Sequence, residues 1–197
     1  MTTTLQKPVQ VGFAFTGSFC TFSQVISQLE AVAQHPNWEV IPIMSPNAYS
    51  IDTRFGLAKD FRAQIQKICN HEIIHTIFDA EPIGPKKLLD VLVVAPCTGN
   101  TLGKLANGIY DTSVTLAVKA HLRNARPVVI AVSTNDALAS SAKNIGTLFN
   151  NRHIFFVPMA QDNAQSKPTS IVADFIKLIP SIESALEEKQ LQPVLLG

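Results

Sequence analysis

Residues 90–101 read Asp-Val-Leu-Val-Val-Ala-Pro-Cys-Thr-Gly-Asn-Thr, and this segment indicates the fold most directly. Residues 91–95 are apolar without a break, which is typical of a central strand in a parallel sheet covered on both faces. The small polar residues that follow lead into a helix expected from about Asn100 to Gly108, and glycine suits the position just after a helix end. A buried strand, a polar loop and a helix in this order predict a βα unit of an α/β protein.

The same alternation continues on both sides of this unit. Apolar runs predict strands at residues 9–15, 38–44, 127–132 and 154–157, and a short strand is also expected at 72–78. Helical spacing of apolar residues predicts helices from residue 22 onward and over residues 55–68, 112–124, 136–150 and 169–188. We therefore expect a single domain over residues 1–197, with a Rossmann-like three-layer α/β fold and a parallel sheet.

Local signals refine these elements. A Thr and a Gln three residues apart predict a capping box at Thr21–Gln24, and Asp52 is a candidate cap for the next helix. Pro42 places its strand near an edge or at a bulge, because proline cannot donate to a strand ladder. Residues 161–168 read as a polar loop, and Pro180 is expected to kink or break the final helix.

Composition excludes several classes of protein. Apolar residues make up 46% of the 197 residues and charged residues 16%, so the chain is not disordered. The net charge of +1, with no run of Lys or Arg, argues against nucleic acid or an anionic membrane as the main partner. We see neither a signal peptide nor an apolar run of roughly 20 residues, so we expect a cytoplasmic protein.

Cysteine and histidine spacing indicates neither a disulfide framework nor a metal site. Cys20, Cys69 and Cys97 are odd in number and widely spaced, so we expect free thiols. Cys97 is interpreted as a small residue that packs under the ligand rather than as a nucleophile. The histidines do not show metal-ligand spacing.

Small polar residues follow four of the predicted strands. Parallel sheets bind ligands outside the carboxyl ends of their strands, so these residues are candidates for a binding site. One glycine in the first loop, instead of G-x-G-x-x-G, favours a mononucleotide phosphate over a dinucleotide. Tight turns and helix caps, including a cap by Asn135 or Asp136, are the alternative interpretation. The candidate cofactor-binding residues are Thr16, Gly17, Ser18, Ser45, Pro96, Thr98, Gly99, Asn100, Thr101, Ser133, Thr134 and Asn135.

These residues fall into three expected roles. The loops that begin at Thr16 and Ser45 would hold a phosphate, and the loop around Asn100 would contact a ring or the substrate. The loop from Ser133 to Asn135 would close the pocket. Asn100 is the best candidate for a catalytic residue. Lys104, Lys119 and Arg123 are candidates for holding substrate carboxylates.

The loops resemble those of the flavoprotein family of flavin-containing cysteine decarboxylases. In that family a Thr-Gly-Ser loop and a Pro-Ala-Ser-Ala-Asn-Thr loop cradle FMN, and the second stands here as Pro-Cys-Thr-Gly-Asn-Thr at residues 96–101. Lys104-Leu-Ala and Gly108 also fit, and the resemblance covers roughly residues 8–160. The resemblance implies an FMN-type pocket and a homo-oligomer, a trimer or a multiple of trimers.

Further motifs narrow the resemblance to one branch of the family. They lie at residues 80–87, 95–101, 119–124 and 133–136, with later matches at 156–158, 161–162 and 167–168. The branch implies a role in forming pyridine-2,6-dicarboxylate from a dihydropyridine precursor. It also implies a partner chain, the A subunit, with a nicotinamide-binding Rossmann domain through which NADP would reach the substrate.

One departure from the family separates three hypotheses. The decarboxylases carry a histidine in a His-Ile segment; here Ile83 matches that isoleucine, Pro82 precedes it, and His75 lies several residues too early. The leading hypothesis is an oxidoreductase subunit that acts with its partner. The alternatives are a stand-alone FMN decarboxylase and a non-catalytic subunit that stabilises the partner. The pocket would hold a flavin, the dicarboxylate or the partner's cofactor.

Overall fold

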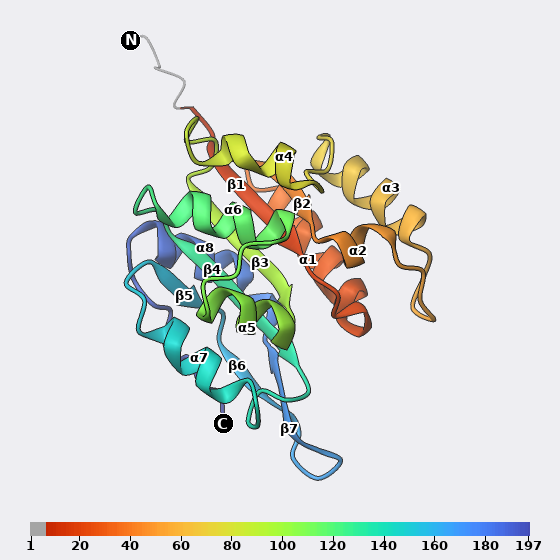
Figure 1. Ribbon diagram of the computed structural model, residues 1–197, viewed down its shortest axis with the longest axis vertical. Helices are drawn as coiled ribbons and strands as arrows, with labels where there is room; N and C mark the ends of the chain where they lie inside the picture. The colour runs from red at the N-terminus through yellow and green to blue at the C-terminus, as the bar shows by residue number, and fades with distance from the viewer. Residues whose placement is uncertain (1–6) are drawn as a thin grey trace.

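The computed structural model describes residues 7–197 and has a central sheet between layers of helices (Figure 1). The strands are β1 (Val9–Phe15), β2 (Trp38–Met44), β3 (Val91–Cys97), β4 (Val128–Thr134), β5 (Ile154–Phe156), β6 (Met159–Asn163) and β7 (Lys167–Ala173). The α-helices are α1 (Phe22–Ala33), α2 (Pro46–Ser50), α3 (Ala58–Cys69), α4 (Ile77–Ala80), α5 (Gly99–Ala106), α6 (Ser113–Leu122), α7 (Ala142–Phe149) and α8 (Leu178–Leu186). The predicted α/β fold is confirmed, and the sheet is mostly parallel where a parallel sheet was expected.

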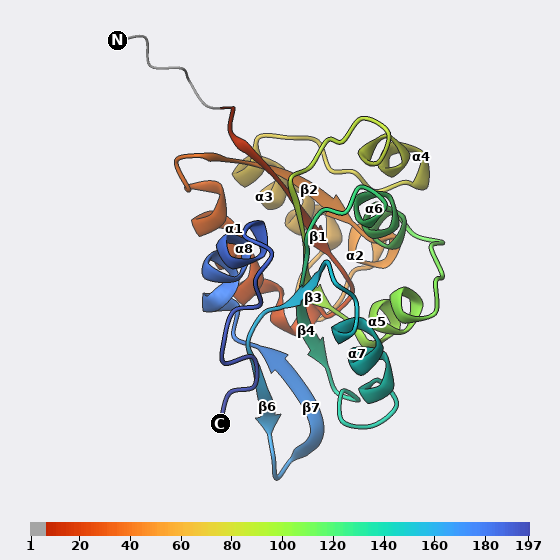
Figure 2. The same cartoon turned by 90° about the vertical axis from the view of Figure 1, so that its left-hand side faces the viewer.

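The sheet has the order β2-β1-β3-β4-β7-β6, and β5 also pairs with β4. Strands β1 to β5 pair in parallel, whereas β7 pairs antiparallel with both β4 and β6. Helices α1 and α8 cover one face, and α5, α6 and α7 cover the other (Figure 2). Every residue of β3 is buried, as its unbroken apolar sequence predicts.

Pro42 lies in β2, an edge strand of this sheet, which confirms the predicted position. The outer side of β2 is partly paired, because the Pro42 carbonyl accepts a hydrogen bond from the Ile74 N–H at 2.9 Å. Ile74 makes only an isolated bridge, so the predicted strand at 72–78 is wrong. Thr76 caps the short helix α4 that begins in this segment, by accepting from the Asp79 N–H at 3.0 Å.

Helix starts and caps differ in part from the prediction; α1 begins at Phe22 as expected, but its cap is not the predicted one. Thr21 is the N-cap residue of α1, but its hydroxyl donates to the Ser18 carbonyl, so the capping box at Thr21–Gln24 is wrong. Asp52 accepts a hydrogen bond from the Ala58 N–H at 2.8 Å and so does cap α3, although the helix itself begins only at residue 58.

Helix α7 begins at Ala142 instead of residue 136, and neither Asn135 nor Asp136 caps it. The Asp136 carboxylate instead accepts hydrogen bonds from the hydroxyl groups of Thr134, Ser140 and Ser141. The backbone between Asp136 and the start of α7 forms turns rather than helix. Leu138, in the part of the predicted helix that is not helical, is 52% exposed.

The largest correction concerns the C-terminal third. The strand predicted at residues 154–157 is present as β5, but it is not the last strand. Residues 161–168 are not a plain loop and no helix starts at residue 169, because β6 and β7 form a hairpin there. Figure 2 shows this hairpin extending past the carboxyl ends of the parallel strands. The final helix α8 runs unbroken through Pro180, because this proline lies in its first turn, where backbone N–H groups have no partner within the helix.

Candidate functional site

The loop after β1 is joined to the loop after β3 by one hydroxyl group. Thr16 is buried, and its Oγ1 donates to the Pro96 carbonyl at 2.7 Å and accepts from the Thr98 N–H at 3.0 Å. Both hydrogen-bonding functions of this hydroxyl are therefore used inside the protein. Thr16 positions the two loops, and Gly17 next to it lines the cavity described below.

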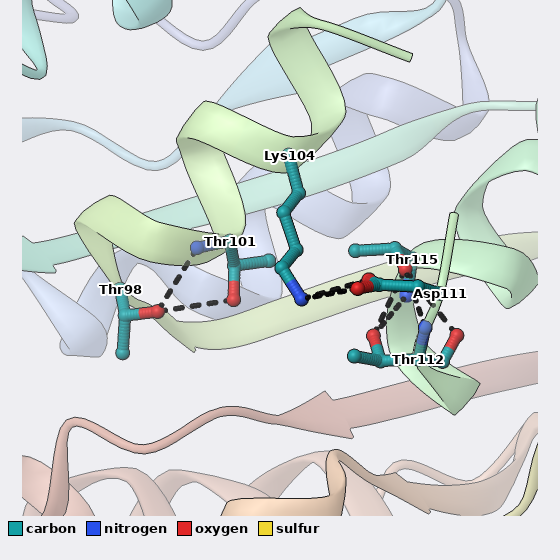
Figure 3. A network of polar contacts seen from close by, with 6 residues as sticks. All are labelled: Thr98, Thr101, Lys104, Asp111, Thr112 and Thr115. Carbon is teal, nitrogen blue, oxygen red and sulfur yellow. Dashed lines mark hydrogen bonds and ion pairs between the residues drawn. The ribbon is translucent and has the colours of Figure 1, made fainter. Parts of the chain in front are cut away.

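The loop after β3 leads directly into α5. Thr98 caps this helix by accepting from the Thr101 N–H at 3.2 Å, and the two threonine hydroxyls lie 3.0 Å apart (Figure 3). Only one of the two hydroxyl hydrogens is needed for the contact between them, so the other is free to donate to a ligand. Asn100 lies in the first turn of α5 and is exposed.

The loop after β4 is tied to the loop after β1. Ser18 Oγ donates to the Ser133 carbonyl at 3.0 Å and lies 2.9 Å from Ser133 Oγ. Thr21 Oγ1 is 3.3 Å from the same Ser133 hydroxyl. These contacts link segments far apart in the chain, and they fix the relative position of two of the predicted binding loops.

Gly99 lies against a carboxylate at the start of α5. A Cβ atom at this position would lie 2.6 Å from Asp136 Oδ1 and 2.8 Å from Ser141 Oγ and Thr134 Oγ1. Hydrogen bonds from Ser140, Thr134 and Ser141 lower the pKa of Asp136, so its carboxylate is ionised at neutral pH. Asp136 therefore gives this end of the site a negative charge that disfavours a ligand anion close to it.

Two adjoining cavities lie at the carboxyl ends of the parallel strands. The first, which we call the inner cavity, has a volume of about 270 Å³. Six predicted site residues line it: Thr16, Gly17, Ser45, Thr98, Asn100 and Thr101. Lys104 also lines it and is the one charged residue among its described lining residues. Ser45 Oγ accepts from the Ala48 N–H at 3.3 Å, so its own hydrogen is free to donate.

The second cavity, which we call the outer groove, has a volume of about 910 Å³. It shares Gly17, Thr98 and Asn100 with the inner cavity. Five more predicted residues line it: Ser18, Gly99, Ser133, Thr134 and Asn135. Of the twelve predicted residues only Pro96 lines neither cavity; it lies buried in β3, and its carbonyl accepts the hydrogen bond from Thr16.

Several residues of the outer groove were missed by the sequence analysis. Arg54 and Phe55 come from the segment between α2 and α3, with the guanidinium carbon 4.9 Å from the ring centroid. Asp162 and Lys167 come from the β6–β7 hairpin and form an ion pair of 2.6 Å. The β-branched residues at 169, 171 and 172 were the available signal for β7.

The remaining candidate residues take other positions. Lys119 lies over the Tyr110 ring at 4.9 Å, and neither it nor Arg123 is among the lining residues of the two cavities. Cys97 is fully buried, and burial raises the pKa of its thiol, so it packs as a neutral small residue. His75 stacks on Tyr49, with 3.8 Å between ring centroids.

No histidine is among the described residues that line either cavity. Residues 7–197 also contain no cluster of His, Cys, Asp or Glu that could hold a metal ion. Over the same residues, no helix combines the length and the apolar character needed to cross a membrane.

Comparisons with known proteins agree on one family. The model of the Flavoprotein family matches residues 2–179. The B subunit of dipicolinate synthase from Bacillus subtilis (strain 168) is 43% identical over 189 residues, which are 96% of this chain and 94% of the relative.

Solved structures extend the comparison. The crystal structure of the dipicolinate synthase B subunit from Bacillus halodurans superposes with a TM-score of 0.88 at 41% identity, covering 96% of each chain. The FMN-dependent cysteine decarboxylase TvaF from thioviridamide biosynthesis has a TM-score of 0.63 at 19% identity, covering 91% of this chain and 98% of its own. The second likeness concerns the fold alone.

Proposed function

The chain belongs to the flavoprotein family and is a homologue of the dipicolinate synthase B subunit, and from this we propose that it is the B subunit of such a synthase. In this role it helps to convert a dihydrodipicolinate-type precursor to dipicolinate, pyridine-2,6-dicarboxylate, during sporulation. It acts together with the A subunit of the synthase. We further propose that it is a homo-oligomer, a trimer or a multiple of trimers.

The observation that carries the proposal is the continuity of the two cavities through Gly17, Thr98 and Asn100. A ligand with a phosphate at one end and a flat ring at the other would extend from the inner cavity into the outer groove. Three donors in the inner cavity suit a phosphate monoester. They are the free hydroxyl hydrogen of Ser45, the one left over in the Thr98–Thr101 pair, and the Lys104 ammonium group. These residues fit FMN, and they equally fit a phosphate of NADP supplied through the A subunit.

Aromatising the dihydropyridine ring removes one hydride and one proton from the precursor. A bound flavin or nicotinamide ring supplies the acceptor for the hydride. The chain's own contribution is orientation of the substrate over that ring. Asn100 lies where both cavities meet, and its amide can donate to a substrate carboxylate and accept from the ring nitrogen.

The substrate is a dianion and needs cationic partners. Arg54 and Lys167 both line the outer groove. Arg54 comes from the segment before α3, and Lys167 comes from the β6–β7 hairpin. Lys167 is held by Asp162 at 2.6 Å, so we propose that Arg54 contributes more of the attraction for a carboxylate.

The missing histidine argues against a decarboxylase. The position that the resemblance assigns to it is Pro82, which lies in a short 3-10 helix (Glu81–Ile83) and does not line the cavities. His75, the nearest candidate in sequence, uses its Nδ1 in a contact of 3.1 Å with the Ile73 carbonyl oxygen. We therefore favour the synthase subunit over the stand-alone FMN decarboxylase.

Reconstitution tests the proposal. We expect purified A and B subunits, mixed with precursor and NADP, to form dipicolinate faster than the A subunit alone. Equal rates with and without this chain would refute a catalytic role. A yellow protein that decarboxylates a substrate without any partner would favour the decarboxylase instead.

Asn100→Ala separates catalysis from scaffolding. We expect dipicolinate formation to fall about tenfold or more while the A–B complex stays intact, since orientation of the substrate is lost. Asn37→Ala is the matched control, because Asn37 is exposed and lies outside both cavities. Full activity of the Asn100 variant would identify this chain as a stabilising subunit.

A further inference from the structure

Lys104, the one charged residue among those described around the inner cavity, is already neutralised by a partner. Its Nζ lies 2.7 Å from Asp111 Oδ1 and 2.9 Å from Asp111 Oδ2. The Lys104 side chain is 22% exposed and that of Asp111 57% exposed. The hydrogen bond from Lys104 lowers the pKa of Asp111, so the carboxylate is ionised at neutral pH.

The ion pair joins two helices at the rim of the cavity. Lys104 belongs to the last turn of α5, and Asp111 directly precedes Thr112, the N-cap residue of α6. Figure 3 shows the Lys104 ammonium between the threonine pair at the start of α5 and the pair Thr112 and Thr115 at the start of α6. The second pair forms a capping box, which fixes the backbone beside Asp111.

The ammonium keeps part of its binding capacity. It has three N–H donors, and the two contacts with Asp111 use at most two of them. One donor therefore remains for a ligand oxygen in the inner cavity. The sum of the two charges is zero, however, so the long-range attraction that a lone lysine would exert on an anion is largely cancelled.

We propose that Asp111 is a specificity-determining residue that weakens the inner cavity as a site for free inorganic phosphate. A phosphate is then retained only as a monoester whose remaining part fills the outer groove. The continuity of the two cavities through Gly17, Thr98 and Asn100 supports this two-part recognition. The inference rests on the phosphate site of the proposed function, but not on which monoester occupies it.

Asp111→Asn removes the charge and keeps the shape of the side chain. We expect inorganic phosphate to bind this variant about fivefold more tightly than the wild type, the size expected when one half-exposed carboxylate charge is removed from near an anion. Separate titrations with FMN and with NADP should show which of these monoesters also binds Asp111→Asn more tightly than the wild type. Riboflavin, which lacks the phosphate, should bind both proteins equally. Isothermal titration calorimetry at low salt measures all four ligands.

Two further variants make the test specific. Lys104→Met removes the ammonium group, so it should weaken phosphate binding and leave riboflavin binding unchanged. Glu187→Gln is the matched control, since Lys189 Nζ lies 2.9 Å from Glu187 Oε2 in an exposed pair that lines neither cavity. This control should bind every ligand as the wild type does.

The outcomes separate the inference from the proposed function. Equal phosphate binding by wild type and Asp111→Asn, including none in either, would show that Asp111 does not limit anion binding. An equal gain for riboflavin would have the same meaning, because the effect would then not act through the phosphate. If phosphate binding responds as expected while FMN and NADP bind neither protein, the inference holds and the proposed cofactors are wrong.

Discussion

His121 should make the stability of this protein depend on pH in the mildly acidic range. The residue is 1% exposed, and its Nε2 lies 3.1 Å from the Pro127 carbonyl oxygen. Burial, helped by the positive charge of Arg126, lowers the pKa of His121 from 6.5 to about 4, although the Pro127 contact and Asp90 act in the opposite direction. The imidazole is therefore neutral in the folded protein at pH 5 and above.

Proton linkage sets the sign of the effect. In the unfolded chain this histidine binds a proton as the pH falls through 6.5, whereas the folded protein resists protonation until about pH 4. The unfolded state is thus favoured as the pH drops through this window, and above pH 6.5 the effect vanishes. With ~1.4 kcal/mol per pKa unit, the difference between 6.5 and 4 corresponds to about 3 kcal/mol once both states are protonated. About 2 kcal/mol of this should be lost between roughly pH 7 and pH 5.

Urea unfolding at about pH 7, 6 and 5 measures the effect in wild type and in His121→Gln. Glutamine can still donate to the Pro127 carbonyl but does not titrate, so this variant should lose about 2 kcal/mol less than the wild type over that range. His153→Gln, which changes a less buried histidine, is the matched control for the loss of a histidine side chain. Parallel pH profiles for wild type and His121→Gln would refute the reasoning, even if the variant is less stable at every pH.

Three further changes test the loops and caps described above. Gly99→Ala should lower the free energy of unfolding by about 1–3 kcal/mol, because the new methyl group would overlap the Asp136 carboxylate. Gly146→Ala is the control and should not destabilise the protein, since a Cβ atom there would meet nothing within 4 Å. Urea unfolding compares the two variants. Thr16→Val should lower the free energy of unfolding by about 1–3 kcal/mol, because the Pro96 carbonyl and the Thr98 N–H both lose their hydrogen-bond partner. The same change should weaken FMN or NADP binding. Unchanged unfolding and binding curves would contradict this prediction. Asp52→Ala should cost about 1 kcal/mol in thermal unfolding, because the Ala58 N–H at the start of α3 loses its acceptor; an unchanged unfolding curve would contradict this.

Sequence patterns were most informative where strands are buried on both faces. Strand β1, which is buried from Val11 to Phe15, matches its predicted bounds. The edge strand β2 matches its bounds as well, although it is only partly buried. The β6–β7 hairpin was missed because its outer half is exposed and polar, so no burial pattern separates it from a loop.

The candidate site was predictable for a topological reason. Parallel strands end at one edge, so loops after β1, β2, β3 and β4 had to meet there. The sequence does not reveal which side chains are already engaged. The Thr16 hydroxyl forms hydrogen bonds with Pro96 and Thr98, which are 80 and 82 positions away in the sequence. The Asp136 carboxylate accepts hydrogen bonds from three hydroxyl groups and does not cap a helix. Such partners depend on tertiary contacts that local patterns do not encode.

The close approach of Gly99 to Asp136 bears on how this site can diverge among relatives. The family pattern Pro-Ala-Ser-Ala-Asn-Thr has alanine where this chain has Gly99, and the space for that methyl group is filled here by the Asp136 carboxylate. An alanine could enter only with a shift of the backbone or of the acid. We therefore expect positions 99 and 136 to covary, with the glycine–aspartate combination inherited as a unit that marks one lineage of this fold.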